Sequence, residues 1–179
     1  MFFSRRLQKM LAVLREIEKQ PISLGTLRSK VPHHTKVMEY DKLPESGSLD
    51  RVFGRHKCLI VLYTMHDVSN RPVGHFSTIL KHGKGKYEYF SSYGFRPEQE
   101  ISKTHSSGKL MRLLGNNFIR SSARLQNNVH SNTCARWAAA RCFLHEVPLQ
   151  VFVKTFTGRC SLKTADDVVT LSTLFLFDR

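Results

Sequence analysis

The sequence has no closely spaced pair of cysteines and no long apolar run. Its four cysteines stand at positions 58, 134, 142 and 160, and no two of them form a Cys-x-x-Cys motif. A disulfide-rich secreted scaffold is therefore not expected, and a reducing compartment is favoured. No stretch approaches the roughly 20 apolar residues of a membrane-spanning helix. We therefore expect that no part of the chain enters a membrane.

The cysteines and histidines also show no spacing that is typical of a metal site. Cys134, Cys142, His145 and Cys160 are close in sequence, but as ligands they would have to come from several helical faces. We therefore expect no bound metal, and nothing in the sequence indicates a cofactor that a reaction would require.

Acidic residues are scarce relative to basic ones. The chain has 28 Lys and Arg against 14 Asp and Glu, which gives a net charge of +14. This excess favours a polyanionic partner, although a generic basic surface is the alternative. Aromatic residues are not interleaved with the basic clusters, so the pattern indicates attraction to phosphates rather than reading of bases. We expect nucleic acid to bind two clusters, which are Arg5, Arg6 and Lys9, and Lys81, Lys84 and Lys86.

The order of the sequence patterns predicts a single α+β domain over residues 1–179. Residues 1–50 are expected to form a helical N-terminal part, which begins with an amphipathic helix over 4–20. Residues 55–125 carry strand signals at 57–64, 75–81, 87–90 and 118–125, with a short helix at 109–114. Residues 126–179 have helical patterns at 134–146, 148–156 and 164–176. We expect a central, mostly antiparallel sheet flanked by helices.

Cys134 stands where a nucleophile is favoured. It follows the polar residues Ser131-Asn132-Thr133 and begins a helix-prone run. A thiol in the first turn of a helix faces unpaired backbone N–H groups and the positive end of the helix dipole, and both favour the reactive thiolate. Upstream, Gly74-His75-Phe76 places one imidazole at the start of a predicted strand. A Cys and a His so placed are the two components of a thiol hydrolase, although each alone is more often a buried structural residue.

Four segments occur in a characteristic order, and they are Gly74-His75-Phe76, Tyr89-Phe90-Ser91-Ser92-Tyr93-Gly94-Phe95, Leu125-Gln126 and Asn132-Thr133-Cys134. This order resembles the adenovirus protease (adenain) family and its relatives among SUMO-deconjugating enzymes. The corresponding family motifs are Gly-His-Trp, Phe-acid-Pro/Ser-x-Gly, Gln and small-x-Cys-Gly. The resemblance covers roughly residues 55–147 and implies a papain-like cysteine protease fold with permuted elements.

The resemblance also implies roles for three side chains. His75 matches the general base and acid, Cys134 the nucleophile, and Gln126 the side chain that helps to form the oxyanion hole. The position of the family's acid is occupied by Ser91. A serine can orient an imidazole through a hydrogen bond, but it cannot balance an imidazolium charge. A Cys-His dyad with Ser91 as a possible orienting group is therefore expected.

Other side chains compete with these assignments. His130 is a second candidate for the base, and Asn127 is a second candidate for the oxyanion hole. Glu88 and Asp67 are weaker candidates for the missing acid. Strand alternation sends Glu88 to the face of its strand opposite position 91.

The function that the resemblance implies is a viral-type cysteine endopeptidase that cleaves virion or capsid precursor proteins during maturation. It would act as a monomer in the virion and in the interior of the infected cell, in the nucleus or cytoplasm. Nucleic acid and a short peptide are implied as activators, and Cys58 and Cys160 are formally available for a disulfide to such a peptide. Two other functions are open: a nucleic-acid-binding protein that has lost catalysis with its acid, and a deconjugase for a ubiquitin-like modifier, which the short chain disfavours.

Overall fold

The structure is a computed structural model that describes residues 2–66, 72–126, 131–158 and 164–177. Four of the candidates named above, Asp67, Asn127, His130 and Cys160, lie outside these ranges, and their roles stay predictions. Among the described helices, none is both long enough and apolar enough to cross a membrane.

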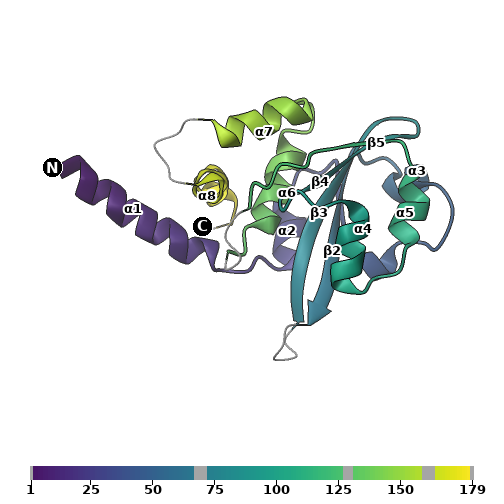
Figure 1. Cartoon of the computed structure of the whole chain (residues 1–179), viewed down its shortest axis with the longest axis horizontal. Coiled ribbons are helices and arrows are strands. Elements are labelled where there is room, and N and C mark those ends of the chain that lie inside the picture. The colour runs from purple at the N-terminus through teal and green to yellow at the C-terminus, as the bar shows by residue number, and fades with distance from the viewer. Residues whose placement is uncertain (1, 67–71, 127–130, 159–163, 178–179) are drawn as a thin grey trace.

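The described residues begin with two helices, continue with five strands interspersed with short helices, and end with three helices (Figure 1). The strands are β1 (Thr35–Glu39), β2 (Cys58–His66), β3 (Pro72–Gly83), β4 (Lys86–Ser91) and β5 (Phe118–Arg120). The α-helices are α1 (Phe2–Glu18), α2 (Leu24–Lys30), α3 (Leu49–Phe53), α4 (Pro97–Thr104), α5 (Lys109–Leu114), α6 (Cys134–Phe143), α7 (Leu149–Thr157) and α8 (Ala165–Phe177), and a 3-10 turn, η1, covers Tyr40–Lys42.

The strands form one sheet in the order β1-β2-β3-β4-β5. β3 is antiparallel to both of its neighbours, whereas the two edge strands run parallel to theirs. The sheet is therefore antiparallel at its centre, as predicted, but mixed as a whole rather than mostly antiparallel, because both edge pairings are parallel. The layout of sheet and helices is compatible with the predicted α+β class, and the papain-like arrangement stays a prediction. The register places His75 opposite Tyr63 and Ser77 opposite Ser91, which brings His75 and Ser91 to neighbouring strands.

Helices pack on both faces of the sheet (Figure 1). Alternate residues of β2 point to opposite faces, as the geometry of a strand requires. Leu59, Val61 and Tyr63 pack with α3 and α5, while Cys58 and Ile60 pack with α6. All five side chains are fully buried, so the apolar run of β2 is covered on both faces. A third cluster joins α6 to α7 and α8 and contains Trp137, Phe152, Phe156 and Val169.

Three elements differ from the sequence prediction. β1 lies in the N-terminal part that was expected to be helical. It was missed because its five residues are mostly polar and form a strand only by pairing with β2. α4 was not predicted, although Pro97 fits the first turn of a helix and Gln99 Oε1 accepts a hydrogen bond from Arg96 N at 2.8 Å. β5 ends at Arg120 rather than near 125, because only three of its residues pair with β4.

Candidate active site

Cys134 is the first residue of α6, as the sequence predicted. The preceding residue, Thr133, is fixed from two sides: its carbonyl accepts a hydrogen bond from Trp137 N at 2.9 Å, and its hydroxyl donates to Asp166 Oδ1 at 2.6 Å. Cys134 as a residue is 8% exposed, and its thiol lies 4.0 Å from Gly74 O. The thiol therefore lies at the edge of the core, in the first turn of α6, where the unpaired N–H groups of a helix are found.

His75 lies on β3, where its backbone is held opposite Tyr63 on β2. Its side chain is buried, and its ring lies 4.8 Å from the ring of Tyr93, measured between centroids. The preceding Gly74 approaches β2 closely, because a Cβ at this position would stand 2.5 Å from Leu62 Cδ1. A larger residue at position 74 would have to displace the Leu62 side chain next to His75.

The carboxylate that the sequence analysis did not find is Glu100 of α4. Glu100 Oε1 lies 2.9 Å from His75 Nε2, and both side chains are buried. The same oxygen accepts a hydrogen bond from Ser91 Oγ at 2.6 Å, while Ser91 Oγ lies 3.5 Å from His75 Nε2. Ser91 thus holds the carboxylate that orients His75. Glu88 is engaged elsewhere, since it pairs with the buried Arg141 at 2.7 Å across the opposite face of β4.

The surroundings of His75 favour its protonated form. Burial lowers the pKa of His75, but the charge of Glu100 and the contact with the Cys134 side chain outweigh this and raise it to about 10. The imidazole is therefore an imidazolium at neutral pH. Because Glu100 engages Nε2, Nδ1 is the nitrogen left for the thiol, and within the described residues Nδ1 makes no hydrogen bond.

Gln126 is fully buried between the end of β4 and the residues that precede α6. Its Oε1 accepts a hydrogen bond from Ser92 Oγ at 2.8 Å. Its Nε2 donates to Ser131 O at 2.9 Å and to Ser131 Oγ at 3.3 Å. The amide therefore links the end of β4 to the segment that precedes Cys134. Its role as an oxyanion donor stays a prediction.

Three acidic side chains, Glu18, Asp166 and Asp167, are buried next to the segment that contains Cys134. Asp166 Oδ1 accepts hydrogen bonds from Thr133 and, at 3.0 Å, from Trp137 Nε1. Nearby, burial and the neighbouring Asp167 and Asp166 raise the pKa of Glu18 to about 7. The end of α1 is tied to the same segment, because Asn132 N donates to Glu18 O at 2.6 Å.

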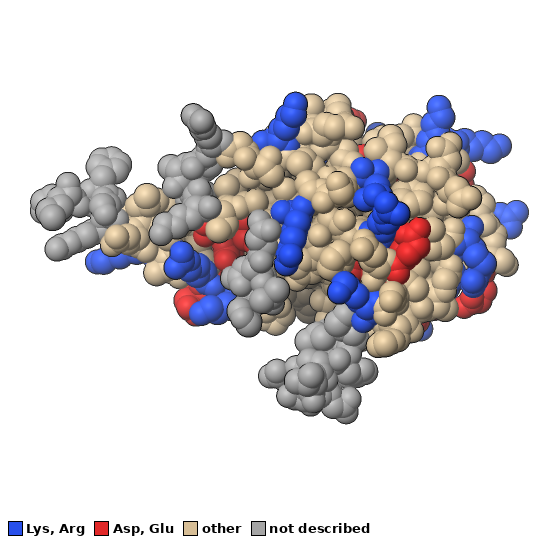
Figure 2. All heavy atoms as spheres, in the orientation of Figure 1, with Lys and Arg blue, Asp and Glu red and all other residues tan. Residues whose placement is uncertain are grey.

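The basic residues predicted to bind nucleic acid belong to two separate elements. Lys9 is exposed on α1, and the described structure does not extend to the side chains of Arg5 and Arg6 in the same helix. Lys84 and Lys86 are exposed at the turn between β3 and β4, whereas Lys81 pairs with Asp50 at 2.8 Å. On the face shown in Figure 2, basic side chains are spread over the surface and are not gathered into one stripe.

The sequence contains only a weak signal for Glu100. α4 buries Pro97, Glu100 and Thr104, which lie three and four residues apart on one face of the helix. A carboxylate on the inner face of a helix needs a buried partner. The partner cannot be read from the sequence, because His75 stands 25 residues upstream on another element.

The fold and the site define an α+β protein in which a helix-terminal thiol, an imidazole and a carboxylate meet at one point. No family model matches the chain. The chain is similar to an uncharacterized protein, V9, of Sputnik virophage, with 23% identity over 176 residues that cover 90% of this chain and 98% of that protein. The similarity extends over most of the chain and links it to a viral protein. The name of that relative states no activity.

Proposed function

We propose that this chain is a viral cysteine peptidase in which Cys134 is the nucleophile, His75 the proton carrier and Glu100 the carboxylate that positions His75. The observation that carries this proposal is the 2.9 Å contact of Glu100 with His75 Nε2, together with the influence of Cys134 on the same ring. The imidazole stands between a thiol and a carboxylate, which is the arrangement that thiol hydrolases use.

The proposed reaction begins with a thiolate at Cys134 and an imidazolium at His75. The sulfur attacks the carbonyl carbon of a peptide bond, and the electron pair of the C=O bond moves to oxygen. When the C–N bond breaks, His75 Nδ1 gives its proton to the leaving amine, so that a thioester and a neutral imidazole remain. The imidazole then takes a proton from water as the water oxygen attacks the thioester carbonyl. The C–S bond breaks, the carboxylic acid product leaves, and the thiolate and the imidazolium are regenerated.

The oxyanion of this reaction needs hydrogen-bond donors near the thiol. The backbone N–H of Cys134 is suitable, because the first N–H groups of a helix have no partner within it. Gln126 is less suitable in the described geometry, since its Nε2 already donates to Ser131. We therefore assign to Gln126 the positioning of the segment before α6.

Glu100 bears on the alternative that catalysis has been lost. That alternative depends on the serine at position 91, which leaves the family's acid position without a charge. Ser91 instead donates a hydrogen bond to Glu100, which supplies a carboxylate to the same imidazole. This geometry favours a working site. We propose virion or capsid precursor proteins as substrates, on the viral connection and the resemblance to adenain, and the charge of +14 supports association with packaged nucleic acid.

A peptide library tests the proposal without knowledge of the substrate. The full chain is incubated with a mixture of peptides derived from a whole proteome, and new amino termini are identified by mass spectrometry. We expect cleavage by the unaltered chain, both with and without double-stranded DNA, and none by C134A. No new termini under any condition, or the same termini with C134A, would contradict the proposed activity.

A further inference from the structure

A second group of cysteine and histidine side chains lies at the other end of α6. It consists of His34 before β1, Cys58 at the start of β2 and His145 after α6. The ligand atoms of these three side chains all lie within 4.8 Å of one another. Cys134 is separated from this group by the length of α6, about 15 Å for a helix of ten residues, so the group is distinct from the candidate active site.

The polar atoms of this group have few of the partners that buried groups normally have, and the contacts that they do make are long. Within the described residues, neither Nδ1 nor Nε2 of His145 makes a hydrogen bond, although both atoms are buried. His145 Nε2 lies 3.6 Å from Glu146 Oε1. His34 Nε2 lies 3.4 Å from Cys142 O, and the Cys58 thiol lies 4.0 Å from the same carbonyl, beside the side chains of Cys142 and Thr35. Buried polar atoms are rarely left in this state, and an absent ligand is one of the usual reasons.

We propose that His34, Cys58 and His145 bind a zinc ion, which holds the C-terminal end of α6 to β1 and β2. One thiolate and two imidazoles are ligands that zinc prefers. Bonds of about 2.0–2.3 Å in a tetrahedron separate ligand atoms by roughly 3.3–3.8 Å, so small side-chain rotations bring this group to the required geometry. No carboxylate belongs to the group, which disfavours calcium and magnesium.

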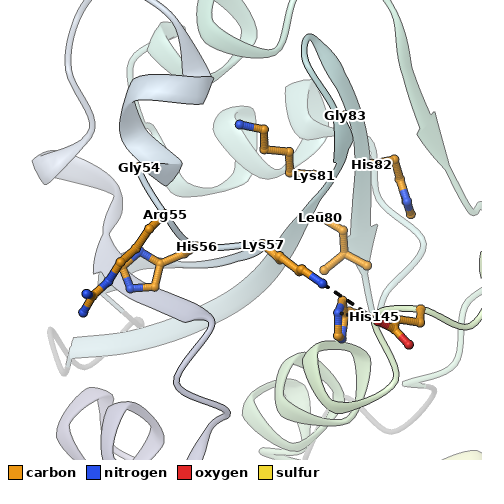
Figure 3. A pocket seen from close by; sticks show the side chains of 10 residues that line it. Gly54, Arg55, His56, Lys57, Leu80, Lys81, His82, Gly83 and His145 are labelled. Carbon is orange, nitrogen blue, oxygen red and sulfur yellow. Dashed lines mark ion pairs between the residues drawn. The ribbon is translucent and has the colours of Figure 1, made fainter.

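The fourth position of the ion would face a neighbouring pocket of about 490 Å³, whose lining includes His145 (Figure 3). Lys57 also lines this pocket and points toward His145 (Figure 3). Its positive charge is partly offset by Glu146, at 3.9 Å, and that of Lys81 by Asp50, at 2.8 Å. A water molecule or a small anion in the pocket could therefore be the fourth ligand. The site would then need no fourth protein side chain.

The competing interpretation is that the pocket binds an anion directly and that no metal is involved. Arg55, Lys57 and Lys81 line it, and phosphate groups bind to such side chains. The nitrogens of His145, which make no hydrogen bond, favour the metal. The ring of His145 lies 4.3 Å from that of His34, measured between centroids, and both imidazoles lie near the Cys58 thiol, as the ligands of one ion would. An anion would leave the Cys58 thiol without a role.

The test is performed on the full chain with C134A as the background, so that the active-site thiol cannot bind metal. Zinc content is measured after dialysis against trace zinc, and Co²⁺ is then used as a spectroscopic substitute that reports a thiolate–metal bond. We expect about one zinc per chain, a thiolate–cobalt absorption band and a higher melting temperature with zinc. H145A in this background should weaken zinc binding at least about tenfold.

Matched controls separate this site from nonspecific binding. His56→Ala removes another histidine of the same pocket, whose Nδ1 already contacts Phe53 O at 3.0 Å, and it should leave the zinc affinity unchanged. Cys58→Ser should abolish the thiolate–cobalt band. If this buried variant does not fold, the His145→Ala result and the band in C134A itself decide. Absence of stoichiometric zinc, binding that His145→Ala retains, or inorganic phosphate binding without any metal would overturn the proposal.

Discussion

Similar side chains from several elements lie near the two ends of α6, in different surroundings. At the N-terminal end, Cys134 meets His75, whose ring is held by the carboxylate of Glu100. At the C-terminal end, Cys58 meets two histidines that no carboxylate holds by a hydrogen bond in the described residues. A carboxylate partner keeps an imidazole protonated and oriented, which suits proton transfer. An imidazole without such a partner keeps its lone pair free, which suits metal binding.

The largest expected effect concerns the thiol and the imidazole of the N-terminal end. Cys134→Ala and His75→Ala should each lower kcat/KM for a cleaved peptide by roughly 10⁴-fold or more, because both residues take part in one proton and sulfur transfer. Cys142→Ala is the matched control from the same helix and should retain most of the activity. Equal losses for Cys134→Ala and Cys142→Ala, with both variants folded, would place the nucleophile elsewhere.

Removing the charge of Glu100 should have the next largest effect. Glu100→Gln keeps the size of the side chain but no longer stabilises the imidazolium, so we expect a loss of about 10²-fold in kcat/KM. Ser91→Ala removes only the hydrogen bond to Glu100, and we expect a loss several times smaller than that of Glu100→Gln. Steady-state kinetics of both variants with the same peptide provide the comparison. A Ser91→Ala defect as severe as that of Glu100→Gln would mean that Ser91 itself orients His75.

The ion pair at the N-terminal end should also make stability depend on pH. The folded-state pKa of His75 is about 10, above its ordinary value of 6.5. The contribution of the protonated imidazole to the free energy of unfolding is therefore complete below pH ~6.5. This contribution, on the order of a few kcal/mol, is lost as the pH rises through about 10. Denaturant unfolding of the unaltered chain at pH 6.5 and pH 10 measures this loss. The same measurement on His75→Gln should show much less change.

Glu18 offers a smaller test, at lower pH, in which the substitution should stabilise the fold rather than destabilise it. Its folded-state pKa is raised from 4.5 to about 7. The folded chain therefore holds a proton that the unfolded chain releases, and stability falls as the pH rises from about 4.5 to 7. Glu18→Gln should raise the free energy of unfolding by roughly 1–2 kcal/mol at pH 8 and leave it nearly unchanged at pH 4. Equal effects at both pH values would show that the carboxyl is not titrated by folding.

The smallest effect is expected at the basic turn between β3 and β4. Reversing the charges of the exposed Lys84 and Lys86 should reduce the salt dependence of DNA binding by up to about two phosphate contacts, a slope change near 0.9 for each. Lys81→Glu is the comparison, and its first effect should be on stability, because Lys81 pairs with Asp50. Peptide cleavage should not change in the variants of Lys84 and Lys86. A salt dependence that does not change would exclude this turn as a contact for nucleic acid.

Local features of the fold were predictable from the sequence. The strand of His75, the helix that begins at Cys134 and the buried run of β2 follow from hydrophobic periodicity and from turn residues. β1 was not predictable in this way, because its polar residues form a strand only through pairing with β2. The parallel edges of the sheet depend on connections between distant elements, which periodicity does not specify.

The candidate site divides in the same way. Cys134 and His75 could be identified because each has a local signal, a helix start and a strand start. Glu100 could not, because its role depends on how α4 packs against β3, and the position that the family motif assigns to an acid holds Ser91. His34, Cys58 and His145 have no motif spacing at all, since they come together from three elements.

The most direct test of the account is the rate at which iodoacetamide alkylates Cys134 as a function of pH, followed by mass spectrometry of each cysteine. We expect Cys134 to react rapidly at pH 6.5, because a neighbouring imidazolium and the first turn of a helix both favour the reactivity of a cysteine. In Glu100→Gln the rate at pH 6.5 should fall at least about tenfold and recover at higher pH. If Cys134 reacts no faster at pH 6.5 than an unfolded peptide thiol, or if Glu100→Gln leaves the pH profile unchanged, the proposed Cys134–His75–Glu100 site is contradicted.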